Sequence, residues 1–147
     1  MADRDEVQVA RWSAIRERVG SCLRELRVGA AATSQARLSG DLEDLGYHVT
    51  QSMISRYEQG LLEQPLTLER LVGWALCCAS LAAPAFRELM EQAGYYLPWS
   101  QEDLARFDTL LRQYRALPLP DQIVLRRKLL WHVLGLRDEA YAQTHRS

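Results

Sequence analysis

The chain has few of the residues that mark several common classes of protein. Its three cysteines are an odd number among 147 residues, and two of them, Cys77 and Cys78, are adjacent. This pattern does not suit a disulfide framework, so reduced core thiols in a cytoplasmic protein are expected. With only 8 glycines and 5 prolines, the composition also excludes fibrous and low-complexity chains.

Long hydrophobic runs are absent as well. No apolar stretch approaches the roughly 20 residues that a membrane-spanning helix needs, so no membrane association is expected. The acidic start, residues 1–6, lacks the apolar segment of a signal peptide. Hydrophobic residues make up 48% of the chain and charged residues 25%, which is typical of a globular protein with its own core.

Charge of one sign is also scarce. The net charge of −1 excludes a protein that coats nucleic acid through bulk positive charge. Residues 1–80 contain nine basic and eleven acidic side chains. A DNA-binding protein of this composition must gather its basic side chains on the surface that faces DNA. We expect a modest affinity for DNA with a shallow dependence on salt.

Strand signals are nearly absent, whereas apolar residues recur at helical spacing throughout, so the sequence predicts an all-α fold. Serine and threonine are placed to begin helices at Thr33 or Ser34, at Thr50, at Thr67 and at Ser100, and glycines are placed to end them. The expected helices span about residues 11–27, 34–45, 51–59, 68–80 and 84–94. A helical hairpin follows, with one helix after Ser100, a break at residues 117–120, a second helix over about 121–136, and a frayed tail.

This pattern predicts two parts. Residues 1–98 form a five-helix domain, and residues 99–147 form a C-terminal hairpin whose apolar surface exceeds what two helices can bury against one another. Such a surface is typical of an interface, so the hairpin is a candidate dimerisation element. The alternative is that it folds back on the fourth and fifth helices.

The most informative stretch runs from Thr33 to Gly60. It predicts two short helices with a tight link and a capped second helix, which are the elements of a helix-turn-helix; that motif lays its second helix in the DNA major groove. One side of this second helix is apolar, with Val49, Ile54 and Tyr57. The other side has short or forked donors suited to base edges: Gln51, Ser52, Ser55 and Arg56.

The segment Val49–Gly60, V-T-Q-S-M-I-S-R-Y-E-Q-G, resembles the recognition helix of the Xre/Cro/cI-type, or lambda repressor-like, DNA-binding proteins. Matches to the other helices of that family extend the resemblance over about residues 19–81: Ser34-Gln35, Leu38-Ser39, Leu26-Arg27 and Thr67-Leu68-x-x-Leu71. Two departures are a longer link over residues 43–48 and a slightly longer turn over residues 27–34.

The resemblance implies a role for each matching residue. Gln51, Ser52 and Arg56 would read bases, with Ser55 beside them. Gln35 would bind a phosphate and steady Gln51. Thr33, Ser34 and Thr50 would cap helices and contact phosphates. Arg27 would form an ion pair with Glu58, and Gly60 would end the helix.

Simpler interpretations exist for both features. The polar side chains within residues 51–56 could form an ordinary solvated helix face. The Arg27–Glu58 pair could also be absent, with Arg27 a surface arginine near some other carboxylate, since Arg24 lies one helical step away.

The function predicted from these residues is that of a homodimeric transcriptional regulator, most simply a repressor, that binds a palindromic operator in double-stranded DNA. The alternatives are an antitoxin-like or adaptor module that binds a protein through the C-terminal helices, and a plasmid or phage maintenance factor. No phosphate-binding loop, nucleophile motif or metal-ligand spacing is present, so no enzyme activity, metal or cofactor is expected.

Overall fold

The computed structural model describes residues 4–29, 32–61 and 64–145, and within these ranges all regular structure is helical. The α-helices are α1 (Arg4–Val28), α2 (Gln35–Asp44), α3 (Gln51–Glu58), α4 (Leu68–Cys77), α5 (Pro84–Ala93), α6 (Gln101–Gln113) and α7 (Leu119–His145), with a 3₁₀ turn η1 (Tyr114–Ala116) between the last two. The prediction of an all-α protein is therefore confirmed for the described residues. None of the helices described is long and apolar enough to span a membrane.

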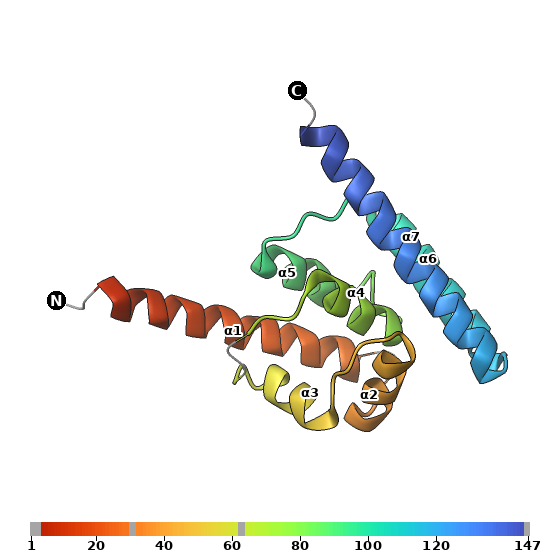
Figure 1. Cartoon of the computed structure of the whole chain (residues 1–147), viewed down its shortest axis with the longest axis horizontal. Helices are drawn as coiled ribbons and strands as arrows, with labels where there is room; N and C mark the ends of the chain where they lie inside the picture. The colour runs from red at the N-terminus through yellow and green to blue at the C-terminus, as the bar shows by residue number, and fades with distance from the viewer. Residues whose placement is uncertain (1–3, 30–31, 62–63, 146–147) are drawn as a thin grey trace.

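The helices surround α4 (Figure 1). Helices α2 and α3 lie on one side of α1, α4 and α5 lie on the other side, and the α6–α7 hairpin closes the far end. Every residue of α4 from Leu71 to Cys77 is buried. Its Trp74 indole donates a hydrogen bond to the Leu23 carbonyl of α1 at 3.0 Å, so the buried ring has its one polar atom satisfied.

The C-terminal hairpin packs against the other helices through several polar contacts. The Asp108 carboxylate of α6 accepts hydrogen bonds from the Leu81 and Ala82 amides, just before α5, at 2.9 and 2.8 Å. Burial raises the pKa of Asp108, and these two amide bonds oppose the increase. In α7, Arg126 lies 3.4 Å from Asp41 of α2, and the Arg127 guanidinium donates to the Asp44 carbonyl at 2.7 Å.

One face of α7 therefore folds back on the rest of the chain. Leu129, Leu130 and Val133 join the main hydrophobic core, and α7 packs on α4. The alternative considered from the sequence, that the hairpin folds back on the preceding helices, is therefore correct in part, and the helices that α7 contacts are α2 and α4. The opposite faces of the hairpin remain exposed.

Both long helices extend beyond their predicted ends. Helix α1 begins at Arg4 and not near residue 11, and α7 continues to His145 where a frayed tail was expected. No proline or glycine interrupts residues 4–10 or 136–145, and the first of these stretches has acidic residues where the helix dipole favours them. The predicted ends of both helices were therefore wrong.

Candidate nucleic-acid interface

Side-chain hydroxyls cap the N-termini of α2 and α3. The Ser34 hydroxyl accepts a hydrogen bond from the Arg37 amide at 3.1 Å, and the Thr50 hydroxyl accepts one from the Met53 amide at 3.2 Å. These are N-caps, which satisfy amides that the helix itself leaves free. Ser34, and not Thr33, is thus the cap of α2.

Helix α3 has the two-sided character that its sequence predicts. Ile54 is fully buried and Val49 nearly so, and both lie in the main core. Tyr57 is half-buried, and burial raises the pKa of its phenol while nearby Arg70 lowers it. The side chains exposed on the opposite side are those of Gln51, Ser52 and Arg56.

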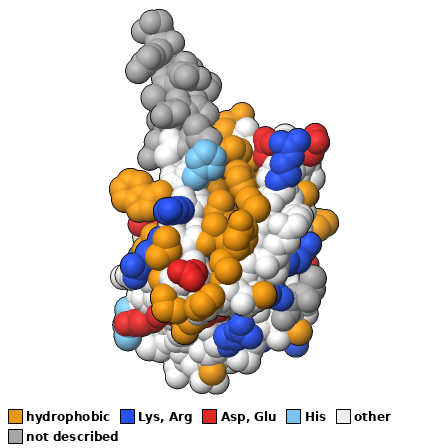
Figure 2. Space-filling view, turned by 90° about the vertical axis from the view of Figure 1, so that its right-hand side faces the viewer, with side chains coloured by type: hydrophobic (Ala, Val, Ile, Leu, Met, Phe, Trp, Pro, Cys, Tyr) orange, Lys and Arg blue, Asp and Glu red, His pale blue; other side chains and the backbone are white. Residues whose placement is uncertain are grey.

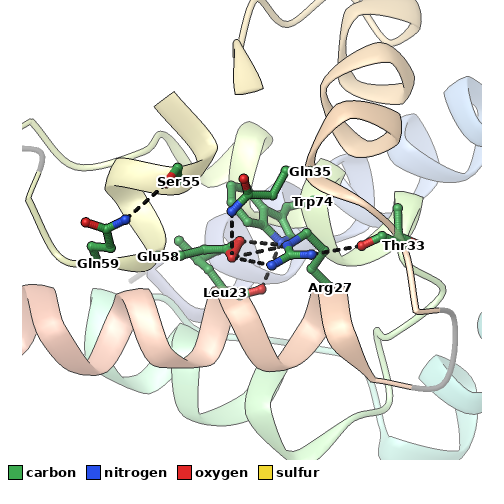
Figure 3. Close-up of polar contacts among 8 residues, drawn as sticks. All are labelled: Leu23, Arg27, Thr33, Gln35, Ser55, Glu58, Gln59 and Trp74. Atoms are coloured by element: carbon green, nitrogen blue, oxygen red, sulfur yellow. Dashed lines mark hydrogen bonds and ion pairs between the residues drawn. The ribbon is translucent and has the colours of Figure 1, made fainter. Parts of the chain in front are cut away.

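Ser55 occupies the border of this exposed side. It is half-buried, and its hydroxyl accepts a hydrogen bond from the Gln59 amide nitrogen at 3.1 Å, one turn further along (Figure 3). Ser55 therefore lies beside the exposed polar residues, as predicted, with its hydroxyl already in contact with Gln59.

An ion pair between Arg27 and Glu58 joins the end of α1 to the end of α3 (Figure 3). Arg27 Nη2 lies 2.7 Å from Glu58 Oε1, and Nε lies 2.8 Å from Oε2, which is the bidentate geometry that a guanidinium favours. The two side chains are only 13% and 4% exposed. The hydrogen bonds to Glu58 raise the pKa of Arg27, against the effect of burial. The predicted pair is therefore present.

Two neighbours complete this polar cluster. Arg27 Nη1 donates to the Thr33 carbonyl at 3.1 Å, and the Gln35 amide donates to Glu58 Oε1 at 3.4 Å. Gln35 thus steadies Glu58 and not Gln51, which differs from the role that the resemblance implied. Thr33 is 7% exposed, so its expected phosphate contact is not available to its side chain.

The backbones of α1 and α3 approach each other closely at glycine positions. A Cβ added at Gly20 would lie 2.6 Å from the Tyr57 carbonyl oxygen, so only glycine permits this approach. Gly60 ends α3 in the left-handed region with φ of 71°, as predicted, and a Cβ there would lie 3.1 Å from Glu17 Cα. The importance of Gly20 could not be read from the sequence, since a glycine in a helix has several explanations.

The longer link between α2 and α3 packs against α4. Gly46 adopts a φ of 97°, and the side chains of Leu42, Leu45 and Tyr47 lie against Gly73 of α4. The Tyr47 hydroxyl donates to Glu69 at 3.1 Å, and burial together with this bond raises its pKa to about 12. A further bond, from the Ser39 hydroxyl to the Val49 carbonyl at 2.7 Å, ties α2 to the residue before the Thr50 cap. The added residues of the link are thus anchored.

Helices α2 and α3 and the link between them hold charges of both signs. Glu58 is paired with Arg27, and the exposed Glu43 lies 3.2 Å from His48. Within α2 and α3 the exposed arginines are Arg37 and Arg56, and Arg37 lies 4.0 Å from Asp41. Arg37 was not singled out in the sequence; its place in the first turn of the capped helix α2 is the signal that could have identified it.

Neither the adjacent cysteines nor the metal-ligating residue types form a reactive or metal-binding site in the part of the chain that the structure describes. Burial raises the pKa of the Cys78 thiol to about 12 and that of Cys77 well above its usual value, so both thiols are protonated at neutral pH. No cluster of three or more histidine, cysteine, aspartate or glutamate side chains is placed to hold a metal ion among these residues. Comparison of the chain with protein-family models, with curated proteins and with solved structures gave no match.

Proposed function

We propose that the protein is a sequence-specific DNA-binding regulator of the lambda repressor-like type, with α2 and α3 as its helix-turn-helix and α3 as the recognition helix. The observation on which this rests is the exposed row of Gln51, Ser52 and Arg56 on a short helix whose other side is core. Glutamine can bond adenine and arginine can bond guanine with two hydrogen bonds each, so this row has the right donors for base edges.

The anchoring of α3 supports the same conclusion. A base-reading helix must hold its side chains in a fixed position relative to the groove, because a hydrogen bond weakens steeply with distance and angle. The Thr50 cap, the Arg27–Glu58 ion pair and the Gly20 contact hold α3 at both ends. The exposed polar side of α3 is therefore held in one orientation relative to the rest of the fold.

The charge balance sets the expected affinity. Phosphate contacts provide most of the salt-dependent affinity of DNA-binding proteins, and the two exposed arginines of α2 and α3 provide few of them. Binding should therefore be modest for one chain, and two chains on a palindrome would combine their half-sites. Repression by occupation of such an operator is the simplest use of the assembly.

Selection of bound sequences from random double-stranded oligonucleotides tests this proposal with the full chain. Enrichment of a palindrome with half-sites about one helical turn apart is the expected result. If no sequence is enriched at low salt, where phosphate contacts are strongest, the protein is not a sequence-specific reader and the proposal fails.

Replacing the base-reading side chains should weaken specific binding without unfolding the protein. Arg56→Ala and Gln51→Ala should each cost about 1–3 kcal/mol on the selected operator, because each removes a base-edge contact. Arg87→Ala, which changes an exposed arginine of α5, is the matched control and should bind as the native chain does. Fluorescence anisotropy measures all three, and equal affinities would remove Arg56 and Gln51 from the reading surface.

The exposed side of the hairpin is the proposed dimer interface. Figure 2 shows that hydrophobic side chains form a continuous band along this face of the molecule. The exposed large hydrophobic side chains of the hairpin, most of all Trp131 at 79% exposure, are those of Leu110, Tyr114, Leu117, Leu119, Val124 and Trp131. Apolar patches of this kind mark interfaces, and a second copy is the occupant that a palindromic operator requires.

Trp131→Ala should shift the protein from dimer to monomer. A tryptophan exposed in the free chain loses no folded-state packing when truncated, but it is a frequent source of binding energy in an interface. Arg87→Ala, at an exposed position of α5 outside the hairpin, is the control. Light scattering over a concentration series measures the change, and a native chain that is monomeric at tens of micromolar would contradict this assignment of the interface.

A further inference from the structure

A cavity of about 180 Å³ lies between α1, the end of α3, the start of α4 and the end of α5. Its wall is mostly apolar, and it is partly open to solvent. The apolar wall residues include Trp12, Ile15, Val19, Leu66 and Leu71. The predicted DNA-reading residues Gln51, Ser52 and Arg56 are not among them, so the cavity is separate from the proposed DNA interface.

Arg16 is the one charged residue in this wall among the described residues. Its Nε is shielded from solvent and has no hydrogen-bond partner in the part of the chain that the structure describes. A buried N–H without an acceptor is unfavourable, and such groups in native proteins are few. Arg16 already lines the cavity, so its guanidinium is within reach of an acceptor on a molecule bound there.

The size and the wall of the cavity suit an organic molecule better than water. An ordered water needs two to four polar partners, which a mostly apolar wall does not supply. Cavities of about 150 Å³ with apolar walls bind a molecule of the size of benzene. An acceptor on such a molecule would satisfy Arg16, and a carboxylate is the acceptor that the planar guanidinium fits best.

We propose that this cavity binds a small carboxylate with a compact apolar body, such as a single aromatic ring. The ring lies against Trp12, Ile15 and Leu71, and the carboxylate is bound by the guanidinium of Arg16. Gln64 and Gln92 also belong to the wall.

The position of the cavity also gives the ligand a route to α3. Tyr57 and Gly60 belong to its wall, and the Gly60 backbone packs directly on residues 16 and 17 of α1. A molecule held between α1 and the end of α3 changes the packing that sets the position of α3. The expected consequence, a change in operator affinity, rests on the proposed function, whereas the binding site does not.

Titration of the full chain with sodium benzoate tests the site without DNA. We expect saturable binding in calorimetry and a saturable change of tryptophan fluorescence, since Trp12 lines the cavity. Benzamide, which keeps the ring and loses the charge, and acetate, which keeps the charge and loses the ring, should each bind at least about tenfold more weakly. Absence of saturable benzoate binding below about 10 mM overturns the proposal.

Variants connect the binding to this cavity. Arg16→Gln should weaken benzoate binding at least about tenfold and leave the weak binding of benzamide unchanged. Arg18→Gln removes the same charge from an exposed position of the same helix and should have no effect. Ala93→Leu fills the cavity from α5 and should abolish binding, which keeps the test valid if Arg16→Gln does not fold. Unchanged affinity in Ala93→Leu would place benzoate elsewhere and refute the site.

The regulatory consequence is measured separately. Benzoate at saturation should change the affinity for the selected operator by at least about threefold, and Ala93→Leu should abolish this response. Benzoate binding with no change in operator affinity would refute the coupling and leave the site in place. A chain that binds benzoate but no DNA would refute the proposed function alone.

Discussion

Replacing Glu58 by alanine should lower the free energy of unfolding by about 3–5 kcal/mol. The substitution leaves the Arg27 guanidinium, 13% exposed, with the Thr33 carbonyl as its remaining partner in the cluster. A buried cation without its carboxylate bears a desolvation cost that water cannot offset. Because the pair also connects α1 to α3, the loss should reach the proposed recognition helix. Urea unfolding followed by circular dichroism measures the change.

Two further variants separate the buried pair from an ordinary surface pair. Glu102→Ala breaks an ion pair between exposed side chains of α6, in which Arg106 lies 3.1 Å from Glu102, and should cost less than about 1 kcal/mol. The double variant Arg27→Met with Glu58→Met should be less destabilised than Glu58→Ala, because no unpaired charge remains. If Glu58→Ala were no worse than Glu102→Ala, the ion pair would not hold α3.

The parts of the fold that were predictable from sequence are those set by neighbouring residues. The hydroxyls of Thr50, Thr67 and Ser100 each accept a hydrogen bond from an amide three residues later, as helix caps do. Glycines 46, 60 and 94 all have positive φ at helix ends. These signals involve few residues and little tertiary context, so the order of the helices follows from them.

The parts that were missed depend on residues far apart in the chain. Arg126 and Asp41 are far apart in the chain, yet their side chains are 10% and 12% exposed and lie together. Asp108 reads as a charge on an amphipathic helix, whereas it binds two amides before α5. Neither contact has a local signal, because each forms only once the hairpin has packed against the other helices.

In the candidate site, too, the features set by neighbouring residues were predictable and those set by distant residues were not. The apolar and polar sides of α3 follow from spacing within eight residues, and the structure places Ile54 and Arg56 on opposite sides as expected. The resemblance implied that Gln35 contacts Gln51, whereas its amide donates a hydrogen bond to Glu58. The position of Gln35 relative to Glu58 depends on the turn between α1 and α2. The cavity beside Arg16 had no signal in the sequence, since five separate segments form its wall.

Removal of the hairpin should have the largest effect on folding. The sequence places a boundary near residue 98, but α7 covers one side of α4, and α6 binds the segment before α5. The hairpin buries Leu104, Leu111, Leu129, Leu130 and Val133. Burial of one such side chain is worth about 1.5–3 kcal/mol, and the sum is comparable to the whole stability of a domain, about 5–15 kcal/mol. Residues 1–98 alone should therefore show no cooperative unfolding transition.

Tryptophan fluorescence makes this outcome measurable, because truncation leaves Trp12 and Trp74 as the two tryptophans. With Trp12→Phe in both chains, Trp74 reports alone, and its emission should move to longer wavelength in the fragment as the ring loses its buried position against Leu23. In the full chain, Leu130→Ala should cost about 2–5 kcal/mol, since it empties part of the α7 contact. Lys128→Ala, at an exposed position of the same helix, should change stability by no more than about 0.5 kcal/mol. A fragment that melts cooperatively near the temperature of the full chain would instead establish residues 1–98 as a domain that folds without the hairpin.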